Sequence, residues 1–280
     1  MKIVVGVDGS DTSMVAMRFA VYEARRRNAG ILIVSCYEVP VSGSPEGAVY
    51  PMQVDEEVVK SAADKVIGRA TELAVEIDPK LVVEGSAILS PPAAGIAEAA
   101  HDGDEIVVGA SGHTGFLEGV LGSVATAVVH RAHVPVIVVP AKPVVEIGPS
   151  MRKLVVGIDG SDLSLEALAW AYEEAELSGA ELTAVYAWKA PHPDSDPTEY
   201  LEATLQSLGS RLTAGTVAVH RKVAEKPAAD ALLDESNDAD LLAVGSHGHG
   251  ALRAALLGSV SHKVAQRAKC PVAIVRPPRK

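Results

Sequence analysis

The chain has 280 residues, of which 48% are hydrophobic and 22% charged, and its formal net charge at pH 7 is −11. This length is enough for two domains rather than one. An acidic chain with 4% aromatic residues and no extended basic run is a poor candidate for binding nucleic acid or an anionic membrane, because both bind clustered Lys and Arg side chains.

Two cysteines, Cys36 and Cys270, are too few for a disulfide framework or for a zinc site made of thiolates. The chain has only a short apolar run before Asp8, so no secretory signal peptide is expected. No apolar run approaches the roughly 20 residues that a membrane-spanning helix needs. We therefore expect a soluble, cytoplasmic protein.

The sequence contains an internal repeat. Residues 2–11 (KIVVGVDGSD) return at 153–162 as KLVVGIDGSD, and residues 104–109 return at 240–245. The offset is 151 residues for the first pair and 136 for the second, so the first copy contains 15 extra residues. We expect them in the stretch 39–54, which is rich in Pro, Gly and Ser.

The counterpart of that stretch, 189–198, is a shorter loop. The two copies are joined by residues 141–150, where two prolines and a glycine interrupt regular structure. The sequence therefore predicts an N-terminal domain at 1–143 and a C-terminal domain at 151–280.

Each copy is expected to alternate strands with helices. Short β-branched runs predict five strands per copy: 3–7, 31–37, 81–88, 106–109 and 136–139 in the first, and 154–158, 182–188, 216–223, 241–245 and 272–275 in the second. Strands that alternate with helices favour a parallel, doubly wound α/β sheet, formed once by each copy.

Four helices are expected between the strands of each copy. The first follows an Asp-Gly-Ser-Asp turn that supplies N-cap residues, and it should end at Gly30 in the first copy and at Gly179 in the second. The middle helices are expected at 55–77 and after Pro92 in the first copy, and at 199–214 and after Pro227 in the second. A last helix precedes the fifth strand.

A glycine pattern, G-x2-G-x9-G-[ST], follows the fourth expected strand of each copy, starting at Gly109 and at Gly245. A glycine-rich turn that leads into a helix presents unpaired N–H groups and the positive end of the helix dipole, which together bind phosphate without Lys or Arg. Ligands of such sheets bind beyond the C-terminal ends of the strands, where the strand order reverses. The pattern therefore predicts a phosphate site in each copy. The alternative is that these glycines serve only tight turns and close helix packing.

These features resemble those of a known family. The Asp after strand one, the glycine pattern followed by Ser-Val, and the closing Cys270-Pro271-Val272 segment are similar to the marks of universal stress proteins, and the resemblance covers nearly the whole chain. It implies two tandem Rossmann-like domains of the adenine nucleotide α-hydrolase-like type. Each would have a five-stranded parallel sheet of order 3-2-1-4-5 flanked by helices.

The resemblance also implies a ligand and a mode of association. The ligand would be ATP, with the requirement for Mg²⁺ left open. The fifth strands would pair edge to edge, either within one chain or between two chains.

The same resemblance assigns site residues by position. Strand-one residues would face the adenosine: Gly6, Asp8, Gly157 and Asp159. Residues near the end of strand two would meet the adenine: Cys36 and Ala187. Glycines of the phosphate turn would donate main-chain N–H groups: Gly109, Gly112, Gly115, Gly245, Gly248 and Gly250. The start of the next helix would complete the cradle with N–H groups and hydroxyls: Gly122, Ser123, Val124, Gly258, Ser259, Val260 and Ser261.

Two departures from the family pattern bear on the site. The family commonly has a Val where Cys36 and Ala187 stand, so the contact with the base differs here. Ala125 stands where the second copy has Ser261. Because Ala125 lacks a hydroxyl that could meet a phosphate, we expect the N-terminal half to bind nucleotide more weakly than the C-terminal half.

Other polar residues are interpreted as structural. The histidines of the glycine-rich turns, His113, His247 and His249, are expected to be polar loop residues, since a metal needs more donors than this stretch offers. As an alternative to ligand binding, Asp8 and Asp159 could cap helices. Cys270 is expected to be an inert buried thiol, and residues 25–27 (Arg-Arg-Arg) a solvated run at a helix end.

Two classes of function fit this pattern. In the first, the protein binds ATP, performs little or no chemistry, and associates with partners according to occupancy. In the second, it is an enzyme, a slow ATPase or an adenylyl transferase, that uses the same cradle. The first is favoured because the sequence has no G-x4-G-K-[ST] loop and no G-x-S-x-G elbow. In a third arrangement, one half binds nucleotide and the other serves as a dimerisation module.

Overall fold

The structure is a computed structural model that describes residues 1–39, 41–43, 49–51, 55–112, 120–188, 196–207, 217–248 and 257–276. The first half contains β1 (Lys2–Gly6), α1 (Asp11–Arg27), β2 (Gly30–Tyr37), β3 (Val41–Gly43), β4 (Val49–Pro51), α2 (Glu56–Ile77), β5 (Val83–Leu89), α3 (Pro92–Ala99), β6 (Glu105–Gly109), α4 (Ser123–Arg131) and β7 (Val136–Val139). The second half contains β8 (Lys153–Ile158), α5 (Asp162–Ser178), β9 (Glu181–Trp188), α6 (Pro197–Ser207), β10 (Val219–Glu225), α8 (Ala228–Glu235), β11 (Leu241–Gly245), α9 (Ser259–Arg267) and β12 (Val272–Val275).

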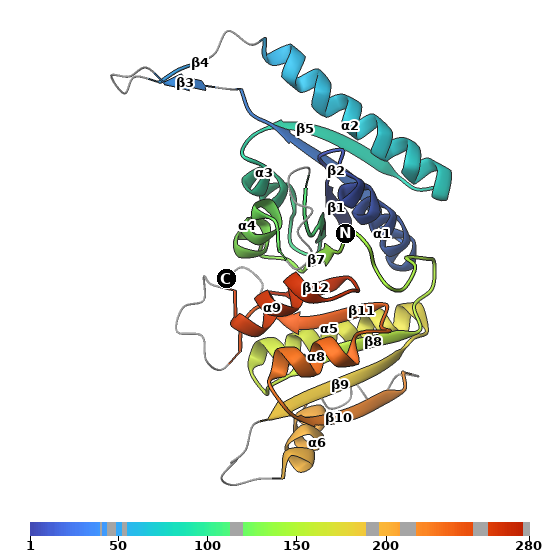
Figure 1. Ribbon diagram of the computed structural model, residues 1–280. Coiled ribbons are helices and arrows are strands. Elements are labelled where there is room, and N and C mark those ends of the chain that lie inside the picture. The colour runs from blue at the N-terminus through green and yellow to red at the C-terminus, as the bar shows by residue number, and fades with distance from the viewer. Residues whose placement is uncertain are drawn as a thin grey trace.

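Ten strands form one continuous sheet in the order β10-β9-β8-β11-β12-β7-β6-β1-β2-β5. Within each half of this sheet all pairs are parallel and the order is 3-2-1-4-5, as predicted. The fifth strands, β7 and β12, pair antiparallel across the middle, with Ile137 opposite Ala273. Figure 1 shows the two halves on either side of this junction, so the expected pairing of the fifth strands occurs within one chain.

The expected strands begin and end within two residues of the observed ones, except that β10 begins three residues later than expected. β10 lies at the edge of the sheet, and its polar sequence (VHRKVAE) gives a weak strand pattern. The expected helix at 199–214 is observed as α6, and residues 208–216 lie outside the described part of the chain. In the stretch 39–54, the described residues include a small antiparallel hairpin of β3 and β4.

The predicted end of the first helix is correct in one half and wrong in the other. Gly179 adopts a left-handed conformation (φ 69°) after α5, as expected of a C-cap glycine. In the first half, Asn28 (φ 51°) has this role, and its N–H donates to the carbonyls of Ala24 and Arg25. Asparagine is the other residue that tolerates this conformation, and Gly30 instead opens β2.

The turn after strand one leads into α1 in the first half and into α5 in the second, and each helix has a serine N-cap. Ser10 Oγ accepts a hydrogen bond from the N–H of Ser13, and Ser161 Oγ accepts one from the N–H of Ser164. The idea that Asp8 and Asp159 are the caps is therefore wrong, because serine occupies the N-cap position in both halves.

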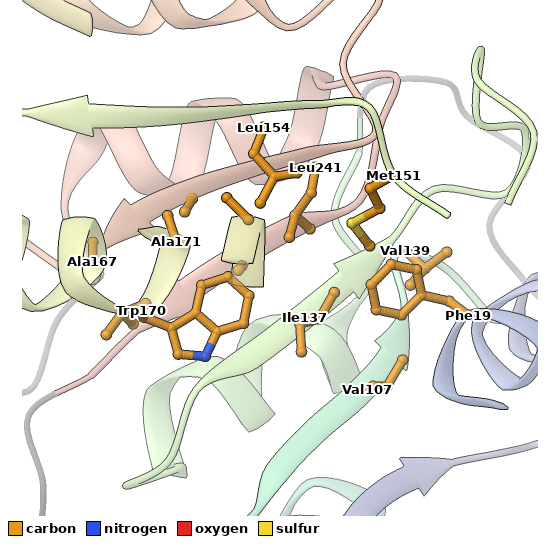
Figure 2. Packing of buried hydrophobic residues seen from close by; sticks show 14 of the residues in the cluster. Phe19, Val107, Ile137, Val139, Met151, Leu154, Ala167, Trp170, Ala171 and Leu241 are labelled. Atoms are coloured by element: carbon orange, nitrogen blue, oxygen red, sulfur yellow. The ribbon is translucent and has the colours of Figure 1, made fainter. Parts of the chain in front are cut away.

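Two apolar layers cover the two faces of the sheet. One contains residues of α1, α2, α5 and α6, and the other contains residues of α3, α4, α8 and α9. The first layer continues across the junction: Phe19 and Ile137 of the first half share it with Trp170 of the second (Figure 2). Because each fully buried aliphatic side chain stabilises the fold by about 1.5–3 kcal/mol, this shared core holds the halves together. Among the described residues, no helix combines the length and the apolarity needed to cross a membrane.

The interpretation of residues 25–27 as a solvated run is wrong for two of the three arginines. Arg25 is 47% exposed and pairs with Asp78. Arg26 and Arg27 are only 5% and 4% exposed, and both bind carboxylates of the second half. They face the junction, a contact between sequence-distant helices that the local sequence did not predict.

Candidate functional site

The strand-one aspartate is held by its own turn in both halves. Asp8 Oδ1 accepts hydrogen bonds from the N–H (2.9 Å) and the hydroxyl (2.6 Å) of Ser10. Asp159 Oδ1 does the same with Ser161, at 3.0 and 2.6 Å. In each turn the residue between the aspartate and the serine is a glycine with positive φ, 86° at Gly9 and 81° at Gly160. These bonds fix the direction of the carboxylate before any ligand arrives.

The other oxygen of each carboxylate lies against the second glycine of the G-x2-G pattern. A Cβ on Gly112 would stand 2.7 Å from Asp8 Oδ2, and a Cβ on Gly248 would overlap Asp159 Oδ2. Heavy atoms cannot approach so closely, so a side chain at either position would displace the carboxylate from the turn. The structure thus brings together two segments that are about 100 residues apart in the chain.

The third glycine of the pattern begins a helix next to the same turn. Gly122 and Gly258 are the N-caps of α4 and α9, and neither helix has a side-chain cap within the described residues. The N–H of Gly122 donates to Ala110 O (2.7 Å), and that of Gly258 donates to Ser246 O (2.8 Å). The next N–H groups have no partner inside the helix and carry the positive end of its dipole. This arrangement suits an anion.

Several predicted site residues have a packing role. A Cβ on Gly109 would stand 2.8 Å from the side chain of Thr12, and one on Gly245 would stand 2.9 Å from the backbone of Leu163. The first glycine of the pattern therefore allows the start of α1 or α5 to pack closely against the end of strand four. Gly6 and Gly157 lie under side chains of α3 and α8, at Ile96 and Leu232. Close helix packing, the alternative interpretation of the pattern glycines, thus accounts for the need for glycine at Gly109 and Gly245, and Gly6 and Gly157 have a similar packing contact.

Ser261 does not present its hydroxyl to the outside. Its side chain is 4% exposed, and the hydroxyl donates a 2.6 Å hydrogen bond to the carbonyl of Gly245. Ser261 therefore gives the second half a hydrogen bond between α9 and the end of β11, which Ala125 cannot make in the first half. The expected loss of a phosphate hydroxyl in the N-terminal half has no basis in this geometry. Ser123 and Ser259, in contrast, are exposed.

The two residues near the end of strand two, Cys36 and Ala187, pack against the apolar layer that contains α3, α4, α8 and α9. Cys36 is partly buried, and its thiol donates to the carbonyl of Pro92 (3.7 Å). Burial raises the pKa of the Cys36 thiol to about 11, so it is protonated at neutral pH. Ala187 is partly buried in the same apolar layer of its own half. Burial raises the pKa of Cys270 to about 12, in keeping with an unreactive thiol.

The remaining predicted residues are only partly covered. Gly115, Gly250, His113 and His249 lie outside the described residues. His247 is described, and its Nδ1 lies 3.2 Å from the hydroxyl of Ser246. Within the described ranges, no group of three or more His, Cys, Asp or Glu side chains is placed to hold a metal ion.

Sequence reasoning missed one contact at the C-terminal site. The hydroxyl of Tyr200, on α6, donates to the backbone carbonyl of Asp159 (3.1 Å) and lies directly over Gly160. Its ring stacks at 4.8 Å on Tyr186 of β9. The chain has only six tyrosines, so a pair of them is a feature worth testing. Nothing in the local sequence, however, places α6 beside the strand-one turn.

Comparison with known proteins identifies the fold and its family. The profile of the universal stress protein family matches residues 1–140 and 151–276. The chain belongs to the universal stress protein family. Universal stress protein Rv2005c of Mycobacterium tuberculosis is 34% identical to it over 291 residues, which cover 98% of this chain and 96% of that protein. A universal stress protein of Mycolicibacterium smegmatis is 33% identical over 286 residues, 98% and 97% of the two chains.

The crystal structure of a universal stress protein from Archaeoglobus fulgidus has the same fold over both halves. Its TM-score is 0.77 at 20% identity, and the match covers 99% of this chain and 96% of that one. Each universal stress protein segment of the present chain thus contains the same three parts at one edge of the sheet. These are an aspartate fixed by a serine, a glycine against its carboxylate, and a helix that begins at an uncapped glycine.

Proposed function

We propose that this universal stress protein binds one adenine nucleotide, ATP first among the candidates, in each half. One observation carries the proposal. In both halves, the carboxylate of strand one and the uncapped start of a helix meet at the same glycine-rich turn. The helix end supplies N–H donors for phosphates, and the carboxylate supplies acceptors for the hydroxyl or amino groups of a nucleoside. The choice of adenine rests on the family resemblance.

This mode of binding fits the charge of the chain. A net charge of −11 would repel a polyphosphate if the binding depended on long-range attraction. Main-chain N–H groups and helix dipoles act over the first turn only, so they can hold phosphates on an acidic protein. Mg²⁺ would reduce the remaining repulsion by neutralising part of the charge of the phosphates.

We further propose that the protein acts through occupancy. Within the described residues, the parts that meet at this edge are carboxylates, glycines, hydroxyls and His247. The hydroxyl beside the histidine, that of Ser246 at 3.2 Å from Nδ1, belongs to a fully buried residue and is not accessible as a nucleophile. Occupancy can change association with a partner only if the nucleotide binds the two association states with different affinities. The nucleotide then acts as a signal and is not chemically converted.

The first test is mass spectrometry of small molecules released from the purified full-length chain before any nucleotide is added. We expect an adenine nucleotide, lost from a Gly112→Ala/Gly248→Ala variant. Gly68→Ala is the matched control, because a Cβ on Gly68 meets nothing within 4 Å. An empty protein that also fails to bind added ATP, ADP, AMP or cyclic AMP would contradict the proposal.

A second measurement separates binding from catalysis. Multiple-turnover phosphate release from ATP should be no faster for the wild-type chain than for a Gly122→Ala/Gly258→Ala variant. A large excess over that variant would support the enzymatic alternative instead.

A further inference from the structure

Five ionisable side chains are almost entirely buried at the junction between the halves. The first half supplies four of them and the second half one: Glu23, Arg26, Arg27, Glu105 and Glu174. Their side chains are 0–5% exposed. A buried charge is costly unless it is paired, so this cluster needs a role that an apolar contact would not fulfil.

The two arginines join the halves. Arg26 donates from Nε to Glu174 Oε1 (2.8 Å) and from Nη2 to Glu23 Oε2 (2.5 Å). Arg27 donates from Nε to Glu23 (2.5 Å) and from Nη2 to Glu174 Oε2 (2.9 Å). The carboxylate of Glu23 in α1 and that of Glu174 in α5 are therefore bridged twice by guanidinium groups.

A second layer of contacts surrounds Arg27. Its Nη2 lies 3.0 Å from Glu105 Oε1, the oxygen that also accepts a 2.8 Å hydrogen bond from the indole N–H of Trp170. The guanidinium carbon lies 5.5 Å from the centre of the Trp170 ring, a cation–π contact. The more exposed Glu173 is 3.3 Å from Nη1. Trp170, which Figure 2 shows in the shared core, thus connects the ionic cluster to the apolar one.

The internal repeat shows that this cluster is not symmetric. α1 and α5 are both 17 residues long and begin after equivalent serines, with an offset of 151 residues. Glu23 therefore corresponds to Glu174, whereas Arg26 and Arg27 correspond to Leu177 and Ser178. Both helices bring a glutamate to the junction, but only the first half brings cations.

A junction between two C-terminal halves would therefore be unsatisfied. Two copies of Glu174 would meet, with leucine and serine in place of the arginines. Such carboxylates would be buried without a counter-charge, which destabilises a contact strongly. A junction with the N-terminal half provides both guanidinium groups.

We propose that this cluster selects the partner of the C-terminal fifth-strand edge: it accepts the N-terminal half, as seen in this chain, and rejects a second copy of the C-terminal half. The backbone pairing of β7 with β12 is not selective, because ladder hydrogen bonds are the same for any sequence. The charges beside it supply the selectivity. This inference is independent of nucleotide binding.

The test uses the full-length chain. Arg26→Leu/Arg27→Ser gives α1 the residues that α5 has at the same places, so at these two positions the first half presents to Glu174 what another C-terminal half would present. We expect faster hydrogen exchange of the β7 and β12 amides, with β1 and β8 still protected. We also expect an unfolding midpoint lower by roughly 10 °C. Arg25→Ser, an exposed change on the same helix, is the control and should leave both unchanged.

Neutralising the glutamates distinguishes charge from packing. Adding Glu23→Gln/Glu174→Gln to the double variant removes the uncompensated carboxylates while the arginines stay absent, so protection of β7 and β12 should return. This holds even if the double variant does not fold. Normal protection of β7 and β12 in the double variant, or failure of the glutamines to restore it, would overturn the proposal.

Discussion

The carboxylate of Asp159 lies so close to Gly248 that a Cβ on this glycine would displace it, and Asp8 and Gly112 repeat this relationship in the first half. In each half, the contact joins the end of strand one to the turn after strand four. It also explains why the second glycine of the pattern is needed, whereas the first is needed for helix packing. The two glycines can therefore be distinguished by experiment.

Gly248→Ala should weaken nucleotide binding to the C-terminal half at least roughly tenfold, equivalent to about 1.4 kcal/mol. The added methyl group displaces the Asp159 carboxylate, which belongs to a partly exposed turn outside the core, so the fold should persist. Isothermal titration calorimetry measures the change. Gly68→Ala controls for the substitution itself, and equal affinity of the Gly248→Ala and wild-type chains would argue against the site.

Ser261→Ala should lower the free energy of unfolding by about 1 kcal/mol, because it removes the hydrogen bond to the carbonyl of Gly245. Nucleotide affinity should change less than about threefold, since the hydroxyl is buried away from the turn. Chemical denaturation and titration report the two quantities separately. A large loss of affinity at unchanged stability would instead support a phosphate contact from this hydroxyl.

Stability should depend on pH through Glu105. Burial, and then the charge of Glu23, raises the pKa of Glu105 to about 8 from its ordinary 4.5, with Arg27 and the Trp170 N–H opposing the shift. Between these values Glu105 ionises in the unfolded chain but not in the folded one, so the free energy of unfolding falls as pH rises, and this dependence ends above the folded-state pKa.

Glu105→Gln is the matched variant for that dependence. It keeps an Oε1 acceptor for Trp170 and Arg27 and removes the titration. Urea unfolding across pH 5 to 8 should therefore show a flatter profile than the wild type. Some dependence remains, because burial also raises the pKa of Glu174, which lies in the same cluster. An equally steep profile in the variant would show that Glu105 is not responsible.

Tyr200→Phe should weaken binding to the C-terminal half by roughly threefold, because the turn that holds Asp159 loses its hydrogen bond to α6. Tyr37→Phe is the control: its hydroxyl donates to Glu56 at an exposed position. Site-resolved NMR of the two strand-one turns can separate the halves. Equal effects of both variants would show that Tyr200 does not position the turn.

Much of the fold could be predicted from local pattern. Val136–Val139 and Val272–Val275 are short apolar runs that each follow a proline, and both were expected at their observed bounds. The resemblance to universal stress proteins implied the strand order, and the repeat gave the place of the glycine turns in both halves. The exceptions have local causes: Asn28 can adopt the left-handed conformation that glycine usually provides, and β10 is a polar edge strand.

The misjudged residues are those whose surroundings come from distant parts of the chain. Nothing near Arg26 and Arg27 reveals that Glu174 arrives about 150 residues later to pair with them. Likewise, the direction of the Ser261 hydroxyl depends on the carbonyl of Gly245, which the pattern alone could not orient. Side-chain roles of this kind depend on tertiary packing, and sequence periodicity gives no information about it.

Native mass spectrometry of the full-length chain titrated with ATP tests the central claim most directly. The account predicts a species carrying two nucleotides per chain, reduced to one by Gly112→Ala or by Gly248→Ala and to none by both. A chain whose mass stays that of the bare polypeptide at millimolar ATP would contradict it.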